Sequence, residues 1–245
     1  MNRKAVEKFI QNCFRFFGLR ISRIDKRQVS DANKLKWLRD FQIKTIIDIG
    51  ASKGSFSAEF HGIFPDAHIY AFEPLPDCFA LVQKRMLGVE RFHAFNMALS
   101  DTAGSSVMHR SSYSGSSSLR EMADLHKNLF PVTAGQREIE IVTDTLDHAL
   151  STYNLQEPIL VKIDVQGFED KVIAGGAHIL SRAHVVLVET SFYELYKGQP
   201  VFDGVYSLLK NLGFEYHGSW APELKSPIDG RLLQQDSVFV RRTDV

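Results

Sequence analysis

The sequence predicts a doubly wound α/β domain built around a mostly parallel sheet. Two observations predict it: strand-like and helix-like segments alternate from Thr45 onward, and glycine or proline marks the ends of the apolar runs. A length of 245 residues with 44% hydrophobic residues is enough for one large domain with a packed core. We therefore expect a Rossmann-like domain over residues 45–245, preceded by an N-terminal helical extension over residues 1–44.

The N-terminal extension is basic and amphipathic. Its first 27 residues hold eight Lys and Arg against Glu7 and Asp25, and apolar residues between Val6 and Phe17 recur at steps of three and four. Such a helix either packs on the main domain or on a sister subunit, or docks on a membrane surface or a partner protein. A second helical stretch is expected over residues 33–41.

The order of the predicted elements defines the sheet. We expect strands at 45–50, 68–73, 91–96, 159–164 and 185–190, and helices at 55–62, 76–87, 168–180 and 201–212. Two final strands, at 214–220 and 237–241, are joined by a loop too short for a crossover helix, so they form an antiparallel pair. The predicted sheet therefore has seven strands.

A loop insert over about residues 99–145 interrupts this alternation. His109–Leu119 carries six serines in eleven residues. A serine run of this kind is typical of a flexible loop, and a long loop inside a compact domain is also typical of an active-site lid or a binding loop. Both interpretations stay open.

Charge and cysteine content exclude several classes of protein. Lys plus Arg and Asp plus Glu both number 29, so no overall positive field attracts nucleic acid. The cysteines, Cys13 and Cys78, have neither metal-ligand nor disulfide-framework spacing. No apolar run is long enough to span a bilayer and no signal peptide is recognisable. We expect a cytoplasmic protein, with peripheral membrane contact left open by the basic helix.

The stretch after the first strand indicates a ligand site. Gly50 and Gly54 let the backbone turn tightly and let a ligand approach, and the next helix offers free N–H groups. A dinucleotide fingerprint would need a second glycine at Ser52. Asp48 would repel a pyrophosphate but attract a sulfonium, which favours S-adenosylmethionine over NAD. The alternative is an ordinary strand-to-helix turn.

Glu73 ends the second strand, at the same predicted edge of the sheet. Its two carboxylate oxygens can accept hydrogen bonds from two ribose hydroxyls. Pro74 and Pro76 then end that strand and start the next helix. The glycine loop, Asp48 and Glu73 together predict an adenosyl-cofactor site.

Seven sequence blocks resemble those of the FkbM-type methyltransferases, in the same order. They are IIDIGASKGSFS, AFEPLP, NMALSDTAG, GSSSL, VKIDVQGFEDKVIAGG, VVLVETS and QQDSVFVRR. The resemblance covers about residues 45–242 and implies a class I S-adenosylmethionine-dependent methyltransferase that methylates an oxygen, often a sugar hydroxyl. It implies cofactor contacts from Asp48, Gly50, Ala51, Gly54, Phe56, Glu73, Asn96, Met97, Ala98 and Asp101. We add Ser52 and Pro74 as candidates because they lie in the same two turns, although Ser52 departs mildly from the family pattern. Gln166 departs from the family pattern, which commonly has an acidic residue there.

Catalysis needs a group that takes the proton of the acceptor hydroxyl. Asp164, at the end of the fourth strand, is the best-placed candidate, and Glu189 and Glu169 are the next carboxylates near the same edge. A strand-end carboxylate with only a structural role is the alternative in each case. Asp48, Asp164 and Glu189 could also hold Mg²⁺, although no spacing requires a metal and none is favoured.

The insert and the segment after the fifth strand supply candidate acceptor contacts. Tyr113, Ser117 and Ser118, with Ser116, can hydrogen-bond sugar hydroxyls, and Tyr193, with Phe192 and Tyr196, can stack on a sugar ring. His109 and His126 are either solvated loop residues or a base brought over the site.

The prediction is thus an O-methyltransferase acting on a sugar hydroxyl of a glycan or glycosylated metabolite. Methylation of another small molecule or of a lipid-linked acceptor is the alternative within the fold. A non-catalytic adenosyl-ligand-binding protein is the alternative outside enzymes.

Overall fold

The computed structural model describes residues 37–220 and 223–242. The chain divides into two units, Met1–Phe41 and Gln42–Val245, and the second holds the sheet. In the first unit, residues 37–40 are helical. The amphipathic basic helix expected between Val6 and Phe17 lies outside the described residues, as do residues 33–36 of the helix expected over 33–41.

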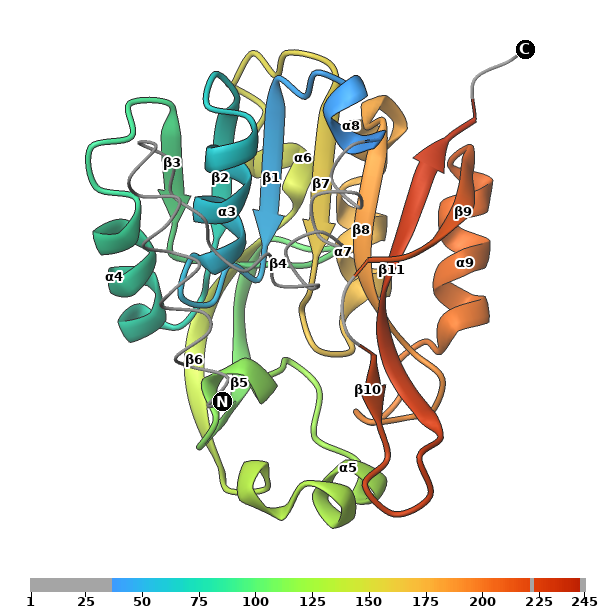
Figure 1. Cartoon of the computed structure of the whole chain (residues 1–245). Helices are drawn as coiled ribbons and strands as arrows, with labels where there is room; N and C mark the ends of the chain where they lie inside the picture. The colour runs from blue at the N-terminus through green and yellow to red at the C-terminus, as the bar shows by residue number, and fades with distance from the viewer. Residues whose placement is uncertain (1–36, 221–222, 243–245) are drawn as a thin grey trace, which may run out of the picture. The chain divides into compact units, whose positions relative to one another are not determined.

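Five parallel strands form the centre of the sheet in the order β3-β2-β1-β7-β8 (Figure 1). They are β1 (Thr45–Ile49), β2 (His68–Phe72), β3 (Phe92–Phe95), β7 (Ile159–Ile163) and β8 (Val185–Ser191). All five residues of β1 are buried, as expected for a strand covered on both faces. These strands lie within or close to their predicted ranges.

Antiparallel strands complete the edge beside β8. β11 (Leu232–Arg241) runs against β8, and both β9 (Phe214–Ser219) and β10 (Leu224–Lys225) pair with β11. The predicted antiparallel pairing of the last two strands is confirmed. β10 brings the described sheet to eight strands, and β11 begins at Leu232 rather than Ser237. The hydropathy pattern did not predict the longer β11, because Gln234, Gln235 and Asp236 separate Leu232 and Leu233 from the apolar residues after Ser237.

Helices cover the two faces of the sheet because the crossover connections run in two directions. The first ones lead from β1 outward to β2 and β3, and the later one leads from β7 the other way to β8. α3 (Ser55–Ile63) and α4 (Pro76–Arg85) connect β1, β2 and β3 on the face turned toward the viewer in Figure 1. α7 (Glu169–Gly175), α8 (Ala177–Arg182) and α9 (Phe202–Asn211) serve the other half of the sheet. The point of divergence is the β1–β7 pair, where α/β sheets bind ligands.

The single helix expected over 168–180 is two helices, which is a correction. α7 ends at Gly175 and α8 begins at Ala177. A Cβ at Gly175 would lie 1.9 Å from the carbonyl oxygen of Ser100, so the chain must pass close to the backbone there. The Asp147 carboxylate then accepts hydrogen bonds from the N–H groups of His178 and Ile179 and caps the second helix.

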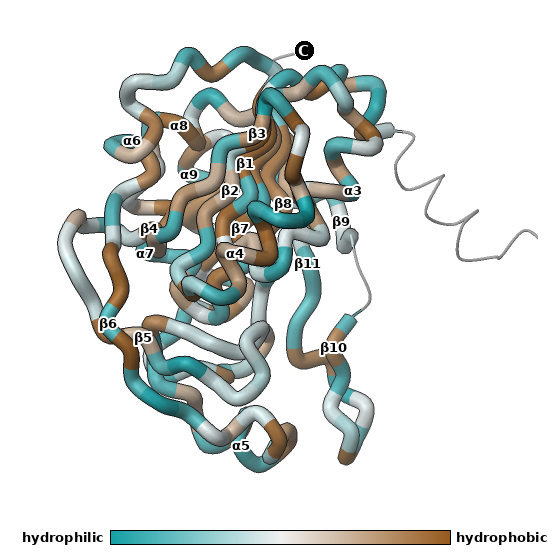
Figure 2. The backbone as a smooth tube through the Cα atoms, turned by 90° about the vertical axis from the view of Figure 1, so that its left-hand side faces the viewer, coloured by the Kyte–Doolittle hydropathy of each residue, from teal (hydrophilic) through white to brown (hydrophobic). Residues whose placement is uncertain are grey.

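The main core lies between the sheet and the helices behind it. It contains Ile47, Val161, Val186, Val172 of α7 and Leu209 of α9, all almost fully buried. Figure 2 shows hydrophobic residues concentrated along the central strands and polar ones at the tips of the connections. Burial of this apolar surface is the main stabilising term, and it leaves the carboxyl ends of the strands free for polar side chains.

The predicted loop insert is a second small sheet. β4 (Ala98–Leu99) and β5 (Gly104–Ser111) both pair with β6 (Gln136–Asp144), and α5 (Asp124–Leu129) lies between β5 and β6. Two single-turn helices, η1 (Ser114–Ser116) and η2 (Pro131–Thr133), complete it. Of the serine run His109–Leu119, residues 109–111 lie in β5 and Ser114–Ser116 form η1, and His109 and Ser118 pair in an isolated bridge. Its strands escaped notice because serine has low strand propensity and the pairing partner lies about 30 residues away.

Among the described helices, none combines the length and the hydrophobicity needed to cross a membrane.

Candidate active site

The turn after β1 is shaped by the backbone of the neighbouring strand. Gly50 has a φ of 78°, and a Cβ there would lie 1.9 Å from the carbonyl oxygen of Asp164. The N–H of Asp164 in turn donates to the carbonyl oxygen of Ile49, at 3.0 Å. Gly54, with a φ of 73°, lies against α4, where a Cβ would be 3.3 Å from Val82 Cα. Both glycines therefore make room for protein atoms at the tight turn, which is the first of the two roles expected for them.

Asp48 lies beneath this turn and is fully buried. Its Oδ2 accepts a hydrogen bond of 2.6 Å from the hydroxyl of Ser57, and its Oδ1 lies 3.6 Å from Lys162 Nζ. Lys162 Nζ also donates to the Gly50 carbonyl at 2.9 Å and lies 3.2 Å from Asp164 Oδ2. The negative charge of Asp48, which was expected to attract a sulfonium, is thus balanced within the protein by Lys162.

Lys162 is the cation that lies between the carboxylates of Asp48 and Asp164. Burial by itself would lower its pKa, but the Asp164 and Asp48 carboxylates raise that pKa above its ordinary value. The signal was present in the sequence: a single lysine inside the apolar strand ILVKI requires a buried partner of opposite charge.

Glu73 lies at the tip of β2 and is 5% exposed. Its Oε2 accepts from the N–H of Ser52 at 2.8 Å, and its Oε1 accepts from the N–H of Leu75 at 2.9 Å. Burial raises the pKa of Glu73 to about 7, although these two backbone N–H groups act to lower it. Each oxygen keeps capacity for a further hydrogen bond, so the carboxylate suits a ligand with two adjacent hydroxyls.

Gln166 joins the carboxylates at the tips of β7 and β8. Its Nε2 donates to Asp164 Oδ1 at 2.9 Å and to Glu189 Oε2 at 2.6 Å. The Tyr196 hydroxyl donates to Gln166 Oε1 at 2.8 Å, which sets the orientation of the amide. Gln234, on β11, donates a second amide bond of 3.0 Å to Glu189 Oε2.

Burial and the nearby Asp164 carboxylate raise the pKa of Glu189 well above its ordinary value. Asp236, across the β8–β11 pair, has its pKa raised to about 6 by burial and by the Asp164 carboxylate. One lysine therefore faces several carboxylates, and they cannot all carry a full charge at once. This is the arrangement expected of a site that takes up a proton.

Glu169 has a different position from the one expected. Its Oε1 accepts from the N–H groups of Gly167 and Val165, at 3.1 and 3.4 Å, and so closes the turn before α7. Burial raises its pKa to about 7. It lines neither cavity of the site, so the structure places it behind Asp164 and Glu189.

Two cavities meet at the carboxyl ends of β1, β7 and β8. The first, of about 490 Å³, extends from Glu73 past Asp164 and Glu189 to the insert and to β10 and β11. The second, of about 450 Å³, opens on the α3 side. Both cavities are lined by the glycine turn, by the start of η1 and by two carboxylates. The shared residues are Gly50, Ser52, Tyr113, Ser114, Gly115, Asp164 and Glu189.

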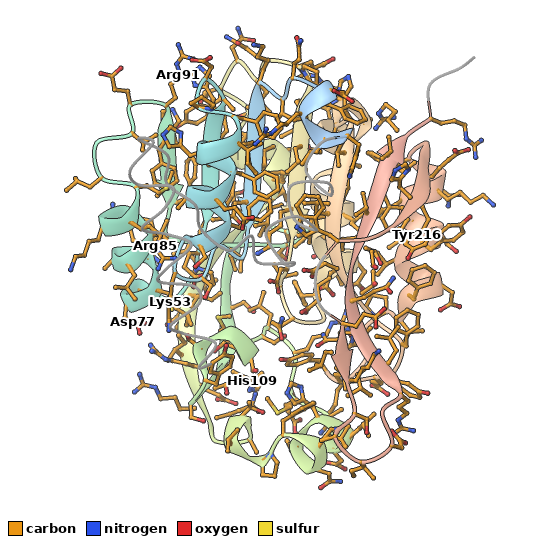
Figure 3. The ribbon with its side chains drawn as sticks, in the orientation of Figure 1. Lys53, Asp77, Arg85, Arg91, His109 and Tyr216 are labelled. Carbon is orange, nitrogen blue, oxygen red and sulfur yellow. The ribbon has the colours of Figure 1, made fainter. Side chains whose placement is uncertain are left out.

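Most of the predicted cofactor residues gather around these cavities. Glu73, Pro74, Met97 and Ala98 line the first, and Ala51 and Phe56 line the second, as does Lys53, labelled in Figure 3. Sequence reasoning missed the apolar wall contributed by Leu75, Cys78, Leu99 and Met108. Leu75 and Cys78 stand one turn apart at the start of α4, which is the only local signal of this wall.

Asn96 and Asp101 line neither cavity. Their side chains instead join elements that surround the cavities. Asn96 Nδ2 donates to the carbonyl oxygens of Glu73 and Pro74, at 2.9 and 3.0 Å, and so ties the β3 tip to the β2 tip. Asp101 forms an ion pair of 2.7 Å with Lys171 on α7.

The predicted acceptor residues divide in the same way. Tyr113 and Ser117 line the first cavity, together with Ser116. Ser118 does not, because its hydroxyl donates to the Gln166 carbonyl oxygen at 2.6 Å. Tyr193 is partly exposed, with the Arg231 guanidinium 4.5 Å from its ring centre, and lines neither cavity.

Of the two histidines considered as bases, only His126 lines the first cavity. His109 lies on β5, with its Nδ1 4.0 Å from a Glu138 carboxylate oxygen on β6 (Figure 3). Within residues 37–220 and 223–242, no three or more His, Cys, Asp or Glu side chains are placed to hold a metal ion. The nearest set of carboxylates is satisfied by Lys162 and by amide donors instead.

The strand order, with its reversed last strand, is that of class I methyltransferases. The methyltransferase FkbM domain model matches residues 48–216, so the chain belongs to the FkbM methyltransferase family.

Two relatives support this membership. The 2-O-methyltransferase NoeI of Sinorhizobium fredii (strain NBRC 101917 / NGR234) is 32% identical over 171 residues, which cover 67% of this chain and 70% of that protein. The methyltransferase sdnD of Sordaria araneosa is 26% identical over 212 residues, covering 76% of this chain and 80% of that protein. A crystal structure of methyltransferase FkbM from Methylobacillus flagellatus KT has a TM-score of 0.49 and 11% identity, and it covers 81% of this chain and 44% of that chain. Family membership rests on the sequence matches.

Proposed function

We propose that this methyltransferase transfers the methyl group of S-adenosylmethionine to a sugar hydroxyl of a glycan or glycosylated metabolite. The observation that carries the proposal is one cavity that contains both a carboxylate suited to a ribose, Glu73, and the paired carboxylates Asp164 and Glu189. The similarity to a protein named 2-O-methyltransferase NoeI supports an oxygen as the methyl acceptor.

The residues around Glu73 fit an adenosyl group. The Glu73 oxygens, each with one backbone N–H partner, can still accept the two ribose hydroxyls. Beyond them, Leu75, Met97 and Met108 form an apolar wall suited to a flat purine ring. Gly50 and Ser52 line the cavity between Glu73 and Asp164, which leaves the methionine end of the cofactor near the paired carboxylates.

S-adenosylmethionine supplies a methyl group activated by its positively charged sulfur. The chain's task is to hold the acceptor oxygen in line and to accept its proton as the new C–O bond forms. Asp164 is the proposed base because it lines both cavities, and Lys162 Nζ lies 3.2 Å from its Oδ2. Glu189, with its raised pKa, shares the Gln166 amide with Asp164 and is placed to share the proton.

Calorimetry followed by an acceptor screen tests this function. The protein is titrated with S-adenosylmethionine and S-adenosylhomocysteine, and we expect saturable binding of both. It is then incubated with methyl-deuterated cofactor and a panel of methyl glycosides, and products are read by mass. We expect a trideuteromethyl ether of at least one glycoside.

Two outcomes contradict the proposal in different ways. If neither cofactor form binds, the adenosyl site is wrong. If both bind but only phenols or lipid-linked acceptors in a parallel panel are methylated, the sugar is wrong and methyl transfer stands.

A further inference from the structure

His126 is a buried polar side chain that the proposed chemistry does not yet use. It lies on α5, is 5% exposed and lines the first cavity. The rings of Phe130 and Tyr196 meet it edge-on, with centroids 5.5 and 5.3 Å away. Its surroundings within the protein are thus aromatic rather than polar.

No hydrogen bond satisfies this ring within the described part of the chain. Nδ1 is buried and has no partner, and neither ring nitrogen bonds to any described residue. Leaving a buried polar group unpaired costs about 1–3 kcal/mol. The other ring nitrogen, Nε2, is not among the buried unpaired atoms and has no hydrogen-bond partner among the described residues, so it is the nitrogen that a ligand in the cavity can reach.

The burial of Nδ1 decides how the ring presents itself. Burial lowers the pKa of His126, so the ring is neutral and carries a single N–H. An orphaned buried N–H is rarer than an orphaned acceptor, so we assign the proton to Nε2 and the unpaired lone pair to Nδ1. The ring then offers the cavity a hydrogen-bond donor without charge.

The position of His126 relates it to the acceptor rather than to the cofactor. Tyr196, which contacts the His126 ring, donates through its hydroxyl to Gln166, and Gln166 holds Asp164 and Glu189. Leu224 of β10 and Gln234 of β11 also line this cavity, and in the order of the sheet β11 and β2, whose tip carries Glu73, lie on opposite sides of β7 and β8. Figure 1 shows α5 beside the end of the β10–β11 hairpin, below the carboxyl ends of the central strands, although the two come from separate parts of the chain.

We propose that His126 binds the methyl acceptor, with its Nε2–H donating to an acceptor oxygen that neighbours the reacting hydroxyl. The ligand class is an uncharged polyhydroxylated ring, because a neutral donor beside aromatic rings suits a sugar hydroxyl or ring oxygen better than a phosphate or carboxylate. This inference rests on the proposed function and deepens it.

Replacements at His126 separate binding from packing. His126→Phe keeps the ring contacts with Phe130 and Tyr196 and removes the donor, whereas His126→Gln restores an N–H near the Nε2 position. With the methyl glycoside that the wild type turns over best, we expect His126→Phe to raise the KM for that glycoside about tenfold, the equivalent of about 1.4 kcal/mol. The Kd for S-adenosylhomocysteine stays unchanged, and His126→Gln recovers part of the loss.

His109→Gln is the matched control in the same insert, because His109 lines neither cavity. We expect wild-type values from it. An unchanged glycoside KM in His126→Phe overturns the inference while leaving the proposed function intact. So does a KM that rises only in step with the Kd for S-adenosylhomocysteine. If the wild type methylates no glycoside, the proposed function itself fails.

A measurement on the unaltered protein covers the case in which His126→Phe does not fold. In protein labelled with ¹⁵N-histidine and saturated with S-adenosylhomocysteine, we expect the His126 signal to be that of the Nε2–H tautomer. Addition of the same methyl glycoside is expected to shift it. A protonated Nδ1, or a signal that does not respond to the glycoside, overturns the inference.

Discussion

The β1–β2 tips and the β7–β8 tips both hold a buried carboxylate, but they hold it by different means. Glu73 accepts from two backbone N–H groups, both within 21 residues of it along the chain. Glu189 accepts two side-chain amides on one oxygen, from Gln166 and Gln234, at separations of 23 and 45 residues. Backbone donors are present in any strand-to-helix turn, whereas amide donors must be delivered by the folded chain.

This difference separates the tasks of the two regions. Backbone N–H groups cannot be changed by substitution, so the β1–β2 tips keep the same ligand chemistry while the side chains around them vary. The β7–β8 tips depend on side chains from several loops and on the insert, so their specificity can change one residue at a time. This division suits a common cofactor bound at the β1–β2 tips and a variable acceptor bound at the β7–β8 tips.

The largest expected effect lies at the β7–β8 tips. Asp164→Asn removes the proposed base, and we expect kcat to fall by about 100- to 10,000-fold, the usual contribution of general-base catalysis. Glu189→Gln is expected to follow with a smaller loss. The Kd for S-adenosylhomocysteine, measured by calorimetry, should change little in either variant, since Glu73 lies at the other end of the cavity. An Asp164→Asn enzyme that turns over its acceptor at the wild-type rate would remove the base assignment.

The next largest effect is expected at the β1–β2 tips, where the affinity for the cofactor should depend on pH. Since the pKa of Glu73 is about 7 without ligand, the carboxyl is mostly protonated at pH 6 and mostly ionised at pH 8. Ribose hydroxyls donate to the ionised form, so binding draws a proton off at low pH. We expect S-adenosylhomocysteine to bind up to about tenfold more tightly at pH 8 than at pH 6.

Glu73→Gln should weaken binding at pH 8 and remove this dependence. Glu169→Gln is the control, because Glu169 also has a pKa of about 7 but lines neither cavity. It should keep the wild-type pH profile. A profile that survives in Glu73→Gln would show that another group titrates on binding.

The smallest effect tests how rigidly the amide bridge is held. Tyr196→Phe removes the hydroxyl that orients Gln166, so the amide is free to turn away from Asp164 and Glu189. The loss of one such hydrogen bond, about 0.5–1.5 kcal/mol, predicts a fall in kcat of about three- to tenfold with an unchanged Kd for S-adenosylhomocysteine. Tyr193→Phe, in the same loop but outside both cavities, should behave as wild type. Equal losses of kcat and cofactor affinity in Tyr196→Phe would mean that the two regions are not separable.

Local patterns predicted the parallel strands and the residues at their tips. The apolar runs of β1, β7 and β8 predict strands without any knowledge of their neighbours. Because the carboxyl ends of parallel strands share one edge of a sheet, the sequence also predicts that Asp164 and Glu189 lie near each other. The insert could not be predicted in this way. β5 and β6 are polar on one face and about 25 residues apart, so only their pairing shows that each is a strand.

The sequence by itself determined the five parallel strands, the glycine turn and the placing of Glu73, because each depends on hydrophobic period, backbone freedom and neighbours a few residues away. The tertiary structure alone decided that Lys162 balances Asp48, that Gln166 and Gln234 converge on Glu189, and that His126 lines the cavity with no partner for its Nδ1 among the described residues. The physical reason is that hydrogen bonds and ion pairs act over about 3 Å, so they join residues only after the fold has brought distant segments together.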